Sequence, residues 1–221
     1  MEKIFFKNES DYYRGIHNLF EFNDRDPVIW KFRKSFFENS DPAGRNIRNN
    51  DTVIKEENRK KRKFLVEILC FCLMPNHIHL LLMQVKDGGI TKFMRKFGTG
   101  YAVHFNNKYK RKGYLFQGRF KDILIKTNEQ LRINFVYIHT NPAALHDHSW
   151  KDGGINNAQE VIKVIENYKW SSYADYLGNK NFPSVTQRDL FNKIMTSHEW
   201  KKFVDDWVGY KKFKLIDSEM E

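Results

Sequence analysis

Two near-continuous apolar runs of strand length, separated by two turn residues, constrain the fold of this chain most strongly. FLVEILCFCLM spans residues 64–74 and HIHLLLMQV spans residues 77–85, with Pro75 and Asn76 between them. Pro and Asn favour turns, and apolar runs of this length are typical of buried strands. The two runs therefore predict an antiparallel β-hairpin.

Helical spacing of apolar residues predicts helices on both sides of this hairpin. Before it, Tyr13, Ile16 and Phe20 indicate a helix over residues 10–22, with Ser10 as a candidate N-cap. After it, an apolar stripe predicts a second helix; its members are Ile90, Phe93, Met94, Phe97, Tyr101 and Phe105. Gly98 and Gly100 cost this helix about 1 kcal/mol each relative to Ala, unless a close backbone approach needs them.

The second half of the chain predicts one more strand and three more helices. Residues 119–127 alternate enough to form a strand, and Thr127 with Gln130 fits a capping box that begins a helix ending at Pro142. Further helices are expected at about 157–168 and about 190–207. Strands and helices mix without βαβ regularity, so the predicted fold class is α+β.

A polar, irregular segment from about Asp24 to Lys63 separates the first predicted helix from the hairpin. It contains Pro27 and Pro42, and its second half is typical of a mobile insertion. An apolar patch is expected to dock the segment to the core; it consists of Val28, Ile29, Trp30, Phe32, Phe36 and Phe37.

Composition excludes several classes of protein. At 221 residues with 41% hydrophobic content, the chain can build a core without disulfides. Cys70 and Cys72 lie too close in sequence to close a useful disulfide loop, which favours a reducing, cytoplasmic compartment. No stretch has the length of a signal-peptide core or a membrane span, so we expect a soluble protein without a membrane partner.

The positive charge is concentrated in one block. Of a net +11, residues 86–126 hold eleven Lys and Arg against two Asp, a net of +9, interleaved with aromatic residues. Such a block suits a groove that neutralises phosphates and stacks unpaired bases, although a solvated basic face over core aromatics is the alternative. The candidate DNA-binding residues are Lys92, Arg95, Lys96, Lys108, Lys110, Arg111, Lys112, Arg119 and Lys121.

Two histidines on the second strand of the hairpin can form half of a metal site. Residues i and i+2 of a strand share a face, so His77 and His79 project side by side while Ile78 and Leu80 face the core. The alternative is a pair of half-buried surface histidines without a ligand.

Two sets of residues can complete this metal site. Cys70 and Cys72 on the partner strand would give a structural Cys2His2 zinc site, although their spacing is unusual for one. Asn141, four residues after Tyr137 on one helix face, would instead give a mixed nitrogen and oxygen site suited to Mg²⁺ or Mn²⁺. Tyr137 would then lie beside the metal; otherwise it is a core aromatic residue.

Several segments, in order, resemble one known family. They are residues 73–82 (LMPNHIHLLL), 113–120 (GYLFQGRF), 137–142 (YIHTNP), 170–173 (WSSY) and 176–178 (YLG). In this combination, the region 64–178 resembles the single-tyrosine HUH transposases, in particular the REP-associated tyrosine transposases.

The resemblance implies a ferredoxin-like antiparallel sheet with helices on one face and a C-terminal helical extension. The chain would divide into a HUH transposase-like domain over residues 1–145, with an insertion at about 24–63, and the helical extension over 146–221. In this family a strand usually precedes the segment that Ile4 to Phe6 resemble, and the present sequence begins at that segment. The first strand of such a core is therefore expected to be missing, unless another segment fills that edge.

The resemblance also implies a mechanism. His77, His79 and Asn141 would hold Mg²⁺ or Mn²⁺, and Tyr137 would attack a phosphate of single-stranded, hairpin-forming DNA. The products would be a 5′-phosphotyrosine and a free 3′-OH, without a need for ATP.

Two other function classes stay open at this stage. One is a catalytically inactive or domesticated nucleic-acid-binding protein that keeps the basic groove. The other is a metal-dependent phosphodiesterase in which water attacks instead of Tyr137. The sequence does not decide whether two copies form a homodimer.

Overall fold

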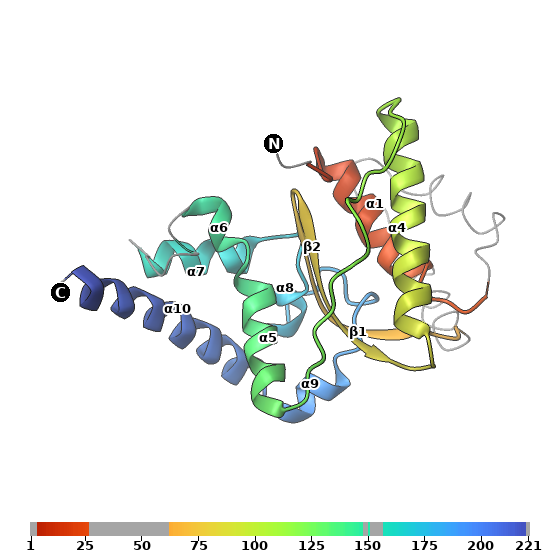
Figure 1. The fold of residues 1–221 in the computed structure, drawn as a ribbon. Coiled ribbons are helices and arrows are strands. Elements are labelled where there is room, and N and C mark those ends of the chain that lie inside the picture. Colours follow the sequence, from red (N-terminus) through yellow and green to blue (C-terminus); the bar gives the residue numbers. More distant parts are fainter. Residues whose placement is uncertain (1–3, 27–61, 148–149, 151–156, 220–221) are drawn as a thin grey trace.

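The computed structural model describes residues 4–26, 62–147, 150 and 157–219. Its elements are α1 (Glu9–Glu21), β1 (Val66–Met74), β2 (His77–Gln84), α4 (Gly89–Lys108), α5 (Asn128–Thr140), α6 (Ala143–His146), α7 (Ala158–Asn167), α8 (Tyr173–Tyr176), α9 (Asp189–Ile194) and α10 (Ser197–Glu219). An antiparallel sheet lies among helices (Figure 1), which confirms the α+β class.

The predicted hairpin is confirmed. β1 and β2 pair antiparallel, with Met74 opposite His77 and Cys72 opposite His79, and the register is irregular between Ile68 and Cys70. Pro75 and Asn76 form the two-residue turn between the strands. The turn thereby places the two histidines at the start of β2, opposite fully buried residues of β1.

Helices cover both faces of the hairpin, so the predicted arrangement with helices on one face is wrong. Phe71 and Leu73 pack into one cluster with the aromatic residues of α4, whereas Cys70 and Cys72 pack into another with α5 and the C-terminal helices. In Figure 1, α1 and α4 lie on one side of the strands and α5 on the other. The physical reason is that β1 is apolar at nearly every position, so both of its faces need cover.

The first helix begins slightly earlier than predicted. Asn8 is its N-cap, because the Asn8 backbone is extended and its side chain accepts a hydrogen bond from the Asp11 amide. Ser10 lies inside the first turn and donates to the Asn8 side chain at 2.8 Å. The candidate cap Ser10 was therefore wrong by two residues.

The apolar stripe of the second predicted helix is confirmed on α4, where Phe93, Phe97, Tyr101 and Phe105 are buried. Gly100 is required by packing, since a Cβ there would lie 2.2 Å from the Phe22 ring atom Cε2. The close approach lets the end of α1 pack against α4.

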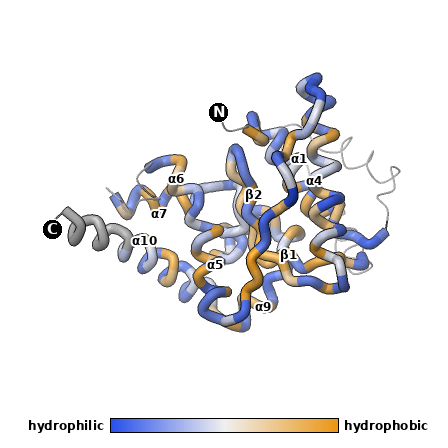
Figure 2. Tube along the Cα trace, viewed as in Figure 1, coloured by the Kyte–Doolittle hydropathy of each residue, from blue (hydrophilic) through white to orange (hydrophobic). Residues whose placement is uncertain are grey.

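The strand predicted over residues 119–127 is wrong. These residues take part in no strand, and Ile123 and Leu124 are 86% and 76% exposed. The connection runs from α4 to α5 without joining the sheet (Figure 1), and Figure 2 shows that its later part is hydrophobic. Alternation creates a strand only where a neighbouring strand supplies hydrogen bonds, and in the part of the chain that the structure describes this segment has no such neighbour.

A segment from the C-terminal region covers the free edge of β1. The Leu73 amide donates to the Trp170 carbonyl at 2.9 Å, and the Ser172 amide donates to the Phe71 carbonyl at 3.0 Å. Further along, the Gln187 amide donates to the Ile68 carbonyl at 3.0 Å. Among the described residues, the edge of β1 that faces away from β2 is therefore hydrogen-bonded by residues outside any strand.

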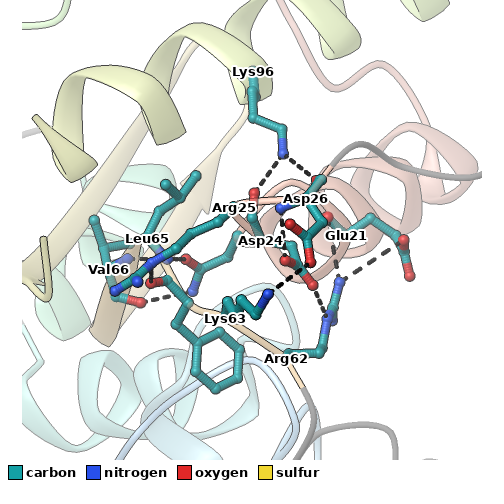
Figure 3. A network of polar contacts seen from close by, with 11 residues as sticks. Glu21, Asp24, Arg25, Asp26, Arg62, Lys63, Leu65, Val66 and Lys96 are labelled. Carbon is teal, nitrogen blue, oxygen red and sulfur yellow. Dashed lines mark hydrogen bonds and ion pairs between the residues drawn. The ribbon is translucent and has the colours of Figure 1, made fainter.

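The ends of the predicted insertion meet in a polar network (Figure 3). The Arg25 amide donates to the Lys63 carbonyl at 2.8 Å, and Arg62 pairs with Asp24 at 3.3 Å. Lys96 of α4 donates to the Asp24 carbonyl at 2.5 Å. The chain thus leaves and returns at one place, while residues 27–61, with the predicted docking patch, lie outside the described residues.

The helix predicted over 157–168 is confirmed as α7, but the one predicted over 190–207 is two helices. Thr196 and Glu199 form a capping box, with the Glu199 amide donating to Thr196 Oγ1 and the Thr196 amide donating to Glu199 Oε2. This box begins α10 as a new helix. In the part of the chain described, no helix is long and apolar enough to cross a membrane.

α10 shares a core with α5. The rings of Phe135 and Trp200 stack with centroids 4.0 Å apart, and both residues belong to one buried cluster. The proposed division into residues 1–145 and 146–221 stays a prediction, since this cluster draws on both ranges.

Candidate active site

The two histidines of β2 lie side by side, as their spacing predicts. The rings of His77 and His79 meet edge to face with centroids 4.7 Å apart. Ile78 and Leu80 pack instead against the core on the α4 side of the sheet. Both histidines are half-buried, and the Nε2 atom of His79 is itself buried.

The turn before β2 orients the first histidine. His77 Nδ1 lies 2.6 Å from the side-chain oxygen of Asn76. Because an amide oxygen only accepts hydrogen bonds, this contact is a hydrogen bond when the ring proton is on Nδ1, and Nε2 is then the ring nitrogen that can bind a metal ion. Histidines that bind metals are commonly oriented in this way, and the Asn76 contribution was not foreseen from the sequence.

Helix α5 brings Tyr137 to the same face. The Tyr137 ring meets the His79 ring edge to face with centroids 5.3 Å apart, and the side chain is 53% exposed. Its neighbours Val136 and Ile138 are buried in the core, since they lie on the inner side of the helix. The alternative that Tyr137 is a core aromatic residue is therefore wrong.

Asn141 ends α5, as predicted, and is tied to the backbone of Tyr137. It is the C-cap residue, and its Nδ2 donates to the Tyr137 carbonyl at 2.6 Å. The side chain is buried, and this hydrogen bond uses the amide nitrogen. The amide oxygen is thus the atom that Asn141 can offer to a cation.

His77, His79 and Asn141 offer imidazole nitrogens and an amide oxygen, and these ligand types suit a cation such as Mg²⁺ or Mn²⁺. The fit rests on the adjacent rings of His77 and His79 and on the orientation of His77 by Asn76. Among the residues that the structure describes, no three or more His, Cys, Asp or Glu group into a metal site. A site here depends on Asn141 as the third protein ligand.

The alternative Cys2His2 zinc site is wrong. Cys70 and Cys72 are fully buried in the core, and together with His77 and His79 they form no metal-binding group. Burial raises the pKa of both thiols, which opposes the thiolate form that zinc requires. The two cysteines act as small core residues.

The nine candidate DNA-binding cations fall into two groups. Lys92, Lys96 and Lys108 contact other parts of the protein: Lys92 donates to the Arg25 carbonyl at 3.1 Å and Lys96 to that of Asp24. Arg111 is half-buried and lies over the Phe105 ring. The exposed remainder consists of Arg95, Lys110, Lys112, Arg119 and Lys121.

Lys108 neutralises a buried carboxylate. Its ammonium lies 2.5 Å from Asp11 Oδ1, and the Asp11 side chain is fully buried. Tyr109 donates to the same carboxylate at 2.6 Å, as does the Lys7 amide at 2.9 Å. Burial alone would raise the pKa of Asp11, but these hydrogen bonds and the Lys108 charge outweigh it and lower the pKa.

A buried polar pair next to the site had no assigned role in the sequence. His139 is fully buried on α5, and its Nε2 lies 2.8 Å from Ser172 Oγ. Burial lowers the pKa of His139 to about 3, so the ring is neutral near pH 7. The available signals were a histidine two residues after Tyr137 and the paired serines after Trp170.

Comparison with known proteins identifies one family. A family model described as "Transposase IS200 like" matches residues 28–141. This range includes β1, β2, α4 and α5, and with them His77, His79, Tyr137 and Asn141. No curated protein and no solved structure matches the chain significantly.

Proposed function

The chain belongs to the IS200-like transposase family, and on this basis we propose that it is a metal-dependent tyrosine transposase that cleaves and rejoins single-stranded DNA. The observation that carries the proposal is the exposed Tyr137 ring packed against His79, which in turn lies against His77. A nucleophile and a cation site would thus share one face of the protein.

The cation would be held by His77, His79 and Asn141. When bound, it supplies positive charge that polarises the scissile phosphate and offsets charge in the transition state. The Asn76 contact to Nδ1 supports Nε2 as the His77 nitrogen that would bind the cation.

The covalent step belongs to Tyr137. Its Oη forms a bond to the phosphorus while the bond from phosphorus to the 3′ oxygen breaks, and the phenol proton is balanced by the proton of the released 3′-OH. One phosphoester bond is exchanged for another, so the reaction needs no ATP. The 53% exposure of Tyr137 leaves room for a DNA strand to reach the hydroxyl.

Single-stranded and hairpin DNA is the substrate class that fits the exposed side chains. Lys110, Lys112 and Arg119 can neutralise phosphates, and the ring of Tyr114, which is 90% exposed, can stack on an unpaired base. The proposed partner is therefore DNA with unpaired bases.

The decisive test uses labelled hairpin oligonucleotides with Mg²⁺ or Mn²⁺, analysed on a denaturing gel. We expect the unsubstituted protein to form a covalent protein–DNA adduct and Tyr137→Phe to form none, with unchanged DNA affinity and melting temperature. The matched control is Tyr210→Phe, which removes the hydroxyl of an exposed tyrosine on α10 and should keep the adduct.

The other function classes predict different products on the same gel. Cleavage that persists in Tyr137→Phe, without any adduct, would identify water as the nucleophile and a phosphodiesterase. DNA binding by the unsubstituted protein without cleavage across a panel of hairpins would identify an inactive nucleic-acid-binding protein. Either outcome would overturn the proposal.

A further inference from the structure

A buried hydrogen-bonded pair connects the helix that carries Tyr137 to the strand paired with β2. We propose that His139 and Ser172 are positioning residues. They fix the position of α5 along the direction of β1, so that the Tyr137 ring meets His79. The inference rests on the proposed role of Tyr137 as nucleophile.

The helix side of the connection is short. His139 lies two residues after Tyr137 on α5, where Tyr137 points outward and His139 inward. The His139 ring is packed on several sides, against Phe135 at 4.3 Å and Tyr173 at 5.3 Å between centroids. A fully packed ring transmits a shift of its hydrogen-bond partner to the helix backbone.

The strand side is equally direct. Ser172 Oγ accepts from the Phe71 amide at 3.0 Å, and the Ser172 amide donates to the Phe71 carbonyl at 3.0 Å. Ser172 is therefore fixed to the backbone of β1. The next residue of β1, Cys72, is the register partner of His79.

A polar contact is needed here because apolar packing does not by itself fix the position of α5 along β1. Apart from His77 and His79, the α5 side of the hairpin is lined by apolar residues such as Cys70, Cys72 and Leu81. Burial of apolar surface has no direction, whereas a hydrogen bond is lost when its atoms separate by about 1 Å, less than the helical rise of about 1.5 Å per residue. The His139–Ser172 contact can thus select one position of α5 along β1.

The first experiment measures position without catalysis. Proteins carrying ¹³C-labelled histidine are examined by NMR, with the His79 ring signal assigned by its loss in His79→Gln. Tyr137→Leu removes the aromatic ring beside His79 and shows how far that ring shifts the signal. We expect His139→Ala and Ser172→Ala to move the signal in the same direction, and His139→Gln, which can keep a hydrogen bond to Ser172, to restore it.

The second experiment measures the chemical step. The assay uses hairpin DNA and Mg²⁺ at a temperature well below the melting temperature of each protein variant. His139→Ala should slow single-turnover adduct formation roughly 10- to 100-fold, and its DNA affinity should stay within about twofold of that of the unsubstituted protein. His139→Gln should recover most of the rate. The control is Tyr168→Phe, which removes a part-buried hydrogen bond to β1, from Tyr168 to the Leu73 carbonyl, that is not donated by α5.

The outcomes separate this inference from the proposed function. A His79 signal that stays in place in folded His139→Ala and Ser172→Ala overturns the positioning role. Equal rate losses in His139→Ala and Tyr168→Phe also overturn it, because they indicate general destabilisation. A shifted His79 signal without any adduct in the unsubstituted protein supports the positioning geometry and rejects the transposase chemistry. If His139→Ala does not fold, Ser172→Ala and His139→Gln supply the same comparison.

Discussion

The imidazole ring of His79 and the phenol ring of Tyr137 meet edge to face with centroids 5.3 Å apart. One ring comes from β2 and the other from α5, and the two elements contact each other directly. The relationship joins two motifs that are far apart in the sequence into one candidate site. The proposed metal-binding role of each histidine can be tested by a separate substitution.

Removal of either imidazole should remove cation-dependent cleavage. We expect His77→Ala and His79→Ala to lose adduct formation at every Mg²⁺ concentration tested, because one of three proposed protein ligands is lost. DNA affinity should stay within about twofold. Gel assays and calorimetric titration with Mn²⁺ measure the two effects, and His198→Ala, at an exposed position of α10, is the control. Full activity in His79→Ala would rule out its role as a ligand.

Lys108 should contribute to stability rather than to DNA binding. Lys108→Met leaves the buried Asp11 carboxylate without its ammonium partner, which should cost about 2 kcal/mol and lower the melting temperature by roughly 4–8 °C. Lys112→Ala, at an exposed position near the end of α4, should leave the melting temperature unchanged, lower DNA affinity and reduce the salt dependence of binding by about one counterion.

Calorimetry and DNA titrations at several salt concentrations measure these two variants. The opposite pattern, with a stable Lys108→Met protein that binds DNA weakly, would show that Lys108 reaches the phosphate backbone. In that case the Asp11 contact would carry little of the stability.

Gly98 and Gly100, two of the three glycines of α4, should respond in opposite directions to alanine. Gly98→Ala adds a Cβ that meets Phe116 at an ordinary 3.9 Å, so helix propensity should stabilise the protein by about 0.5–1 kcal/mol. Gly100→Ala places a Cβ 2.2 Å from the Phe22 ring and should destabilise by about 1–3 kcal/mol. Urea unfolding of both variants measures the difference. Equal stabilisation would show that the Phe22 ring moves aside without cost.

Stability should fall with acid in a way that depends on His139. Burial lowers the pKa of His139 from its ordinary 6.5 to about 3, so between these values the unfolded chain binds a proton that the folded protein excludes. The stabilising contribution is present above pH 6.5 and is lost as the pH falls, at about 1.4 kcal/mol per unit at most. His139→Gln has no such group. The difference in unfolding free energy between the two proteins, measured from pH 7 to 4, should therefore shrink or reverse toward pH 4, and a constant difference would contradict the buried neutral state.

The local elements were predictable where neighbouring residues alone determine them. The turn at Pro75 and Asn76, the stripe through Phe93 and Phe97, and the cap at Thr127 depend on periodicity and local hydrogen bonds. The capping box at Thr196 and Glu199 belongs to the same class and could have been used to divide the last helix.

Apart from the helix boundaries at Ser10 and Thr196, the errors concern contacts between distant segments. The strand expected over 119–127 needed a neighbour, and no alternation of Ile123 and Ile125 can supply one. Likewise, nothing local to Lys108 reveals that a buried carboxylate of α1 lies beside it. The sequence therefore shows which residues are basic, but it does not show which of them contact other groups of the protein instead of solvent.

By itself, the sequence determined the hairpin, the shared face of His77 and His79, and the helix on which Tyr137 and Asn141 lie, because strand and helix periods follow from backbone geometry. Only the tertiary structure decided that Tyr137 is exposed against His79, that Cys70 and Cys72 are core residues, and that Trp170 to Ser172 cover the edge of β1. These outcomes depend on which surfaces exclude water from one another, and that is settled by the packing of the whole chain.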